Sequence, residues 1–134
     1  MYADGSALVQ FLPGAPFGED WRRWFGERRL VTNQVGITEL HGIAWPLGPA
    51  ARDAADDVEA RVEVARLSDR ALQVASHVSS ALSSFVALHV GTAVAHQDVE
   101  TVATYQRELA QVARLYGLAV VTPGWPERWW EFPA

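Results

Sequence analysis

Apolar and polar residues follow two alternating patterns along this chain. Short apolar runs bounded by turn-forming or charged residues are typical of buried strands. Longer segments repeat apolar residues every three or four positions, as one face of a helix does. The candidate strands occupy 1–3, 30–32, 61–67, 100–104 and 118–123. Because parallel strands need long crossover connections, this alternation predicts an α/β fold with a short-stranded, mainly parallel sheet wrapped by helices.

The candidate helices lie between these strands, and local signals mark several of their ends. The helical segments are 7–12, 19–29, 34–48, 50–60, 70–82, 83–95 and 106–117. Asn33 is a suitable N-cap, Ser68 or Asp69 can cap the segment that follows it, Pro46 stops or kinks the third helix, and Gly117 closes the last.

Three segments differ from the rest of the chain in their residue composition. Segment 19–29 is amphipathic, with Trp21 and Trp24 on its apolar face. Segment 83–95, "SSFVALHVGTAVA", is apolar or small almost throughout, so it is either the lining of a site or the interior of a buried helix. The tail 125–134 is rich in tryptophan and is interpreted either as an arm folded on its own domain or as part of a dimer or partner interface.

Composition narrows the function classes. A chain of 134 residues that is 49% hydrophobic can form one domain with its own core. The absence of cysteine excludes disulfides, thiolate zinc sites and a cysteine nucleophile. With neither a basic leader nor an apolar run of roughly 18 residues, we expect a cytoplasmic protein that has no contact with the membrane. The net charge of -5 means that RNA binding would need a local basic patch or a metal.

Common catalytic motifs are absent from the sequence. It contains neither a "GxxxxGK" nor a "GxGxxG" phosphate loop, and no "GxSxG" nucleophile elbow. The histidines include no pair spaced by four residues on a helix, so a two-histidine zinc site has no support. We interpret each of them as structural or solvated: His41, His77, His89 and His96.

Two acidic residues occupy unusual positions. Asp4 follows the first predicted strand, where ligands bind in open parallel sheets, although an aspartate there is also a common turn or cap residue. Glu39 lies four residues from Val35 and from Ile43, on the apolar stripe of its helix. A carboxylate on that stripe needs a partner, because burying an unpaired charge is costly. We expect that partner to be an arginine or a divalent metal shared with Asp4.

Four stretches in chain order resemble the motifs of PIN domains of the VapC toxin type. They are "ADGSALV" at 3–9, "VTNQVGITEL" at 31–40, "FVALHVGTAVAHQDVETVATYQRELAQVA" at 85–113 and "LAVVTPG" at 118–124. The resemblance implies a PIN-like domain over 1–124 with three α/β/α layers, followed by the tail 125–134. It also implies the activity of a magnesium- or manganese-dependent endoribonuclease that is neutralised by a small antitoxin protein.

The resemblance assigns the site residue by residue. Asp4 and Glu39 match the first two metal-binding acids, and Ser6 matches the hydroxyl of the opening turn. The third acidic position holds Val86 and the fourth holds Gln106, so half of the acidic set is missing. Gln106 could still offer a neutral carbonyl oxygen to a metal or its water, whereas valine offers no ligand atom.

Further acids lie near the fourth position in the sequence. Asp98 and Glu100 precede the fourth predicted strand, at positions that the family pattern does not use for metal.

These observations lead to three hypotheses. The first is a catalytically degenerate or weakened PIN domain that retains partner binding. The second is an active Mg- or Mn-dependent ribonuclease toxin that uses Asp4, Glu39 and an unconventional further ligand. The third gives the main role to the aromatic surface, in a homodimer or an antitoxin complex.

A patch of arginines could bind RNA phosphates, or it could be a solvated helix face: Arg22, Arg23, Arg28 and Arg29.

Overall fold

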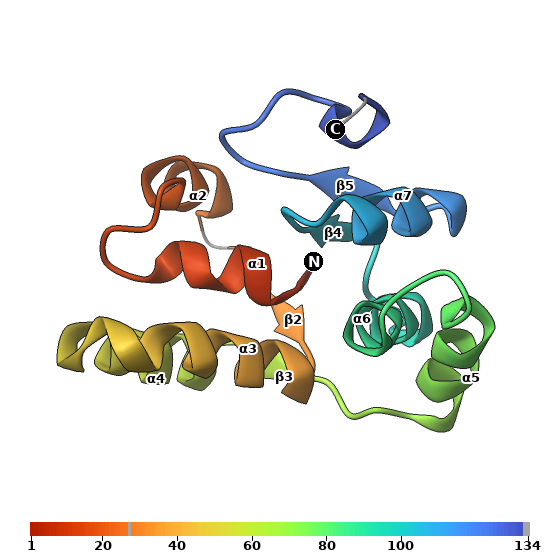
Figure 1. Cartoon of the computed structure of the whole chain (residues 1–134), viewed down its shortest axis with the longest axis horizontal. Coiled ribbons are helices and arrows are strands. Elements are labelled where there is room, and N and C mark those ends of the chain that lie inside the picture. Colours follow the sequence, from red (N-terminus) through yellow and green to blue (C-terminus); the bar gives the residue numbers. More distant parts are fainter. Residues whose placement is uncertain (27, 133–134) are drawn as a thin grey trace.

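The computed structural model describes residues 1–26 and 28–132, which build an α/β fold around one parallel sheet (Figure 1). Its strands are β1 (Tyr2–Ala3), β2 (Val31–Thr32), β3 (Glu63–Val64), β4 (Thr101–Ala103) and β5 (Ala119–Val121). Their order is β3-β2-β1-β4-β5, and all four pairings are parallel. The predicted α/β class and parallel sheet are therefore confirmed.

Seven α-helices and three short 3₁₀ turns connect the strands within these residues. The α-helices are α1 (Gly5–Leu8), α2 (Gly18–Phe25), α3 (Gln34–Ala44), α4 (Pro49–Arg61), α5 (Asp69–Val78), α6 (Ser84–Ala95) and α7 (Arg107–Leu115). The 3₁₀ turns are η1 (Val9–Phe11), η2 (Trp45–Leu47) and η3 (Trp129–Glu131). None of these helices is both long and apolar enough to cross a membrane.

Two apolar clusters on opposite faces of the sheet create three layers. Ala3 and Ala103 point into a cluster formed with α1, α2, α3 and α4. Tyr2 and Val102 point into the other cluster, which α5, α6 and α7 complete. The alternation of neighbouring strand residues between the two clusters is the pleat of the sheet. Figure 1 shows the first helix group on one side of the strands and the second on the other.

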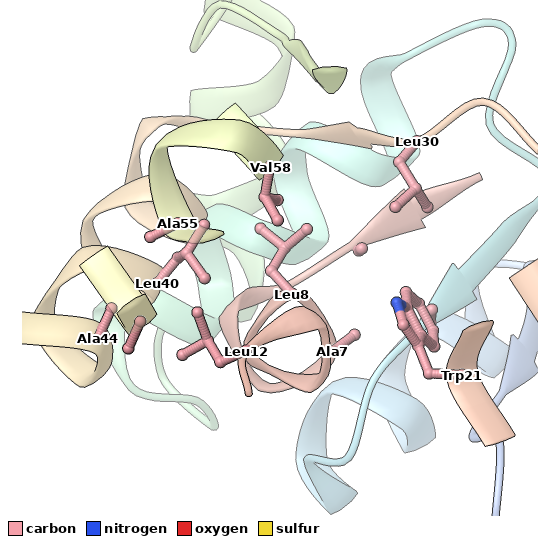
Figure 2. Close-up of a cluster of buried hydrophobic side chains, with 12 residues drawn as sticks. Ala7, Leu8, Leu12, Trp21, Leu30, Leu40, Ala44, Ala55 and Val58 are labelled. Atoms are coloured by element: carbon pink, nitrogen blue, oxygen red, sulfur yellow. The ribbon is translucent and has the colours of Figure 1, made fainter. Parts of the chain in front are cut away.

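The first cluster is organised around α1 and the turn that follows it. Figure 2 shows Leu8 and Leu12 directed toward Leu40 and Val58 of the outer helices, while Trp21 lies toward Leu30. All six side chains are at most 3% exposed. Burial of each large apolar side chain contributes about 1.5–3 kcal/mol to folding.

Most predicted helix ends agree closely with the structure, but segments 19–29 and 70–82 end earlier than predicted, at Phe25 and Val78. The side chain of Asn33 caps α3 by accepting the Gly36 amide at 3.0 Å, and Ser68 rather than Asp69 caps α5. The helix predicted over 19–29 instead ends at Phe25. Gly26 takes a φ of +54°, a conformation that glycine adopts without the penalty a side chain would impose.

Helix α6 is the interior helix that the apolar sequence of 83–95 permits. Seven of its twelve residues are buried, including His89 and Thr92. Its neighbour α5 approaches so closely that a Cβ on Gly91 would lie 2.1 Å from the Ala71 carbonyl oxygen. The segment is thus a core helix whose polar side chains have buried partners.

The C-terminal residues up to Phe132 fold back onto α7. Trp129 and Trp130 are 6% and 8% exposed and pack with Ala110. The guanidinium of Arg107 donates to the Trp130 carbonyl at 3.1 Å and also to the carbonyl of Phe132. Two of the tail's tryptophans are therefore buried within the chain itself.

Candidate functional site

The candidate site lies at the carboxyl ends of β1 and β4. The strand order reverses beside β1, and in open parallel sheets such a point is where ligands bind. Asp4 follows β1 and Thr104 follows β4, so the topology brings together two residues that are 100 positions apart. We call this region the strand-end site and define it by six residues: Tyr2, Asp4, Ser6, Glu39, His89 and Thr104.

Asp4 is fully buried and both of its carboxylate oxygens accept hydrogen bonds. Oδ1 accepts from the Ser6 hydroxyl at 2.6 Å and from the Ala7 amide at 3.1 Å, and Oδ2 accepts from the Thr104 hydroxyl at 2.8 Å. Burial raises the pKa of Asp4, whereas nearby His89 and the three hydrogen bonds act to lower it. Asp4 is thus the N-cap of α1 as well as a candidate ligand.

Ser6 and Thr104 connect Asp4 to the loop that leads into α7. The Ser6 hydroxyl accepts the Tyr105 amide at 2.8 Å, and the Thr104 hydroxyl accepts the Gln106 amide at 3.0 Å. Gln106 occupies the N-cap position of α7, and its side chain makes no capping hydrogen bond. The loop is therefore fixed to Asp4 through its backbone and two hydroxyls.

Glu39 interacts with a buried histidine. Its Oε1 lies 2.5 Å from Nε2 of His89 and accepts the Gly5 amide at 3.3 Å. The other ring nitrogen of His89 lies 2.6 Å from the Tyr2 hydroxyl, and burial raises the pKa of that phenol well above its ordinary value. If the protonated phenol donates to Nδ1, the ring proton lies on Nε2 and is donated to Glu39.

The predicted surroundings of Glu39 were wrong in two respects. The buried face of α3 consists of Gly36, Ile37, Leu40 and Ala44, and the Glu39 side chain is 25% exposed at its margin. Ile43, placed on the same stripe by the sequence, is 54% exposed. The polar groups that contact Glu39 are a histidine and a backbone amide, so the arginine, one of the two expected partners, is not found there, and the metal shared with Asp4 stays a prediction.

Close backbone approach makes this pairing possible. A Cβ on Gly5 would lie 2.4 Å from the Cβ of Glu39, so the first turn of α1 can contact α3 only without a side chain. A Cβ on Gly36 would lie 2.1 Å from the Thr32 hydroxyl and 3.5 Å from Cε1 of His89. Both glycines leave space that the neighbouring side chains fill.

Val86 belongs to the apolar core on α6. It is 8% exposed and clusters with Tyr2, Val31 and Val90. His89 lies three residues further along the same helix, fully buried. Sequence reasoning interpreted His89 as structural or solvated and overlooked its pairing with Glu39. Its place in an otherwise apolar helix was the one available signal.

Asp98 and Glu100 lie at the amino-terminal ends of the parallel strands, whereas Asp4 lies at their carboxyl ends. The Glu100 carbonyl accepts the Ala119 amide where β4 and β5 begin, and the Asp98 amide donates to His96 before that point. Asp4 and Thr104 lie where β1 and β4 end. Neither of the two additional acids therefore joins the strand-end site.

The donor set does not fit the four-carboxylate metal site that the resemblance implies. Within residues 1–26 and 28–132, no three histidine, aspartate or glutamate side chains are grouped closely enough to hold a metal ion. The strand-end site offers two carboxylates, of which Asp4 already accepts three hydrogen bonds and Glu39 contacts His89. Hard divalent cations favour several oxygen ligands, and two carboxylates supply fewer than the four that the resemblance implies.

Comparisons with known proteins identify no relative of this chain. No family model, no curated protein and no solved structure matches it. The resemblance to PIN domains therefore rests on the sequence motifs alone.

Proposed function

We propose that this chain is a PIN-like domain of the VapC type whose metal-dependent RNA cleavage is lost or strongly weakened and which acts by binding a partner. The observation that carries the proposal is the contact of Glu39 with His89 beside a buried Asp4 whose oxygens are already hydrogen-bonded. These are the two acids that the motif resemblance assigns to the metal.

The placement of the motif residues supports a common origin with such domains. Asp4 and Ser6 from one segment and Glu39 from another meet at the strand-end site, and the Gln106 amide is tied to it through the Thr104 hydroxyl. Val86 lies on α6, the helix that also carries His89. The residues that resemble the family motif thus lie on elements that converge near Asp4.

The electrostatics of the site support the loss of cleavage. Two like charges about 4 Å apart repel by about 4 kcal/mol at an effective dielectric of 20, so a cluster of four carboxylates attracts a divalent cation strongly. With valine and glutamine at two of the positions, that attraction is reduced. Each remaining carboxylate already has polar partners in the protein, since Asp4 accepts three hydrogen bonds and Glu39 contacts His89.

Titration calorimetry with Mn²⁺ on the full chain tests this proposal. The proteins are the wild type, a Val86→Asp/Gln106→Asp variant that restores both acids, and an Asp4→Asn control. We expect no micromolar binding and no cleavage of single-stranded RNA by the wild type, and a gain of both in the restored variant. An aspartate in place of buried Val86 would destabilise the fold. The single variant Gln106→Asp is therefore added, because residue 106 is only half-buried.

One outcome would favour the active ribonuclease over the degenerate domain. If the wild type bound Mn²⁺ at micromolar concentration and cleaved RNA, and Asp4→Asn abolished both, Asp4 and Glu39 would work with an unconventional further ligand. Cleavage that survives Asp4→Asn would instead indicate a contaminating nuclease.

The partner in this proposal is a small antitoxin-like protein, and RNA or a second copy of the chain are the competing partners. Light scattering of the purified chain, with and without residues 125–134, tests self-association. A dimer that becomes a monomer on truncation would assign the tail to an interface.

A further inference from the structure

A groove between α2 and α4 combines an apolar floor with arginine side chains. Phe11 in η1 and Phe25 at the end of α2 form its floor together with Val58 of α4. Two cavities of about 290 and 220 Å³ share these three residues and Arg61, so they are halves of one depression. Figure 1 shows α2 and α4 on either side of the α1 segment that leads into η1.

Three arginines of this groove have no carboxylate partner among the described residues. Arg22 and Arg61 line the first cavity, and Arg28 joins Arg61 in the second. No carboxylate oxygen in residues 1–26 and 28–132 lies within 4.0 Å of any of the three. Arg28 stacks over Trp24 with its guanidinium carbon 4.5 Å from the ring centre. We call this region the arginine groove and define it by Phe11, Arg22, Phe25, Arg28, Val58 and Arg61.

The charge of the groove contrasts with that of the whole chain. The protein carries a net charge of -5, yet Asp57 is the only acidic residue among the described residues that line the two cavities. An acidic ligand is therefore repelled by much of the surface and attracted to this groove. Such complementarity steers association and selects the orientation of a partner.

We propose that the arginine groove binds a short segment of a protein partner in which apolar side chains alternate with aspartate or glutamate. Its apolar side chains would contact Phe11, Phe25 and Val58, and its carboxylates would pair with Arg22, Arg28 and Arg61 in the bidentate geometry that guanidinium groups favour. This inference rests on the proposed partner-binding function and specifies the chemistry of that partner.

The aromatic rings in the floor favour a peptide over RNA. Phe25 stacks on buried Trp21 with an interplanar angle of 5°, and Phe11 meets both rings edge-on at 80° and 84°. These contacts hold the two half-buried phenylalanine rings against the core. Single-stranded nucleic acid binds by stacking bases on accessible aromatic faces, and the floor of this groove offers mainly apolar contact between two helices.

Fluorescence polarisation with a labelled synthetic peptide tests the inference. The probe is a short peptide that alternates Glu or Asp with Leu and Phe, and two matched peptides replace its acids by lysine or its apolar residues by serine. We expect the first peptide to bind the full wild-type chain and both matched peptides to bind at least about tenfold more weakly.

Charge reversal then locates the bound peptide. Arg22→Glu combined with Arg61→Glu should weaken binding at least about tenfold, since each replaces an attraction by a repulsion. Arg23→Glu is the matched control, because Arg23 lies in the same last turn of α2, pairs with Glu19 and lines neither cavity. Perturbed amide resonances in α2 and α4 on peptide addition would support the same location.

Three results would overturn the inference. The first is no binding of the acidic peptide. The second is equal binding by wild type and the Arg22→Glu/Arg61→Glu variant, which would leave a partner-binding function but place it elsewhere. The third is that a labelled single-stranded RNA binds the wild type more tightly than the peptide does, and that the Arg22→Glu/Arg61→Glu variant no longer binds this RNA. None of these results depends on Mn²⁺ binding, so this inference and the proposed loss of cleavage fail separately.

Discussion

The strand-end site and the arginine groove hold their charged groups in opposite ways. At the strand-end site, Asp4 accepts hydrogen bonds on both oxygens, and both ring nitrogens of His89 have partners within 2.6 Å. In the groove, Arg22 and Arg61 lie above an apolar floor that Asp57 also borders, and within residues 1–26 and 28–132 no carboxylate oxygen lies within 4.0 Å of either arginine.

The comparison distinguishes charged groups that stabilise the fold from charged groups that are available to bind another molecule. A buried charge has to be satisfied inside the protein, because water cannot solvate it there. An exposed arginine over an apolar surface keeps its hydrogen-bonding capacity for another molecule. Substitutions at the strand-end site should therefore change stability, and substitutions in the groove should change binding with little effect on stability.

His89→Ala should have the largest effect on stability. It leaves the buried Tyr2 hydroxyl without this partner, removes the nearest polar group from Glu39 and creates a cavity. We expect a loss of roughly 3 kcal/mol in the free energy of unfolding, measured by urea denaturation. His77→Ala is the control, because His77 is exposed on α5 and its loss should change stability by less than about 0.5 kcal/mol. Equal effects of the two substitutions would contradict a structural role for His89.

Gly5→Ala tests the close contact between α1 and α3. The added methyl would force Glu39 away from Gly5 and His89, at a cost of about 1–3 kcal/mol in unfolding free energy. Gly42→Ala is the matched control, because a Cβ at this exposed helical position meets no atom within 4 Å. It should stabilise the protein by about 0.5–1 kcal/mol. Destabilisation by both substitutions would argue against a specific contact at Gly5.

Asp4→Asn should change the pH dependence of stability. Because burial raises the pKa of Asp4 above 3.8, the folded wild type holds this proton more tightly than the unfolded chain does. Its stability is therefore highest below the ordinary pKa and falls as pH rises through the raised value, by less than about 1.4 kcal/mol per pH unit for one group.

The asparagine variant lacks this titration, so its stability relative to wild type should increase with pH over that window. Thermal unfolding at a series of pH values measures the difference. A relative stability that is constant or decreases with pH would show that the pKa of Asp4 is not raised.

Charge reversal in the groove should have the smallest effect on stability. Arg22→Glu and Arg61→Glu each place a negative charge in the last turn of a helix, which costs no more than about 1 kcal/mol. Arg23→Glu should cost a similar amount, because it lies in the same turn as Arg22. Urea denaturation of the three variants provides the measurement. A much larger loss for Arg61→Glu alone would mean that this arginine supports the fold.

Local sequence signals were sufficient to predict most elements of the fold. Apolar periodicity separated strands from helices, and Asn33, Ser68 and Gly117 lie at the helix ends where their side chains or backbone conformations are favoured. Helix α2 ends before the predicted Arg29 because Gly26 adopts a positive φ at the C-cap, a local glycine signal that the apolar periodicity of the segment does not report.

These local signals did not predict which side chains contact one another in the strand-end site and in the arginine groove. Tyr2 and His89 are 87 positions apart, and apolar periodicity reports which face is buried but not which side chain meets another. Two of the groove's three arginines, Arg22 and Arg28, were noted in the sequence together with Arg23 and Arg29 as a possible phosphate-binding patch. The sequence did not reveal that Arg61, from a different helix, would join Arg22 and Arg28.

The central position of β1 has a consequence for how the protein folds. This strand precedes the other four in the chain, yet it pairs with β2 on one side and with β4, about a hundred residues later, on the other. Contacts between residues so distant in the chain are entropically costly to close and slow folding relative to helical bundles of similar length. The hydrogen bond between Asp4 and Thr104 can therefore form only once β4 has been synthesised, and β5 still has to join the sheet beside β4.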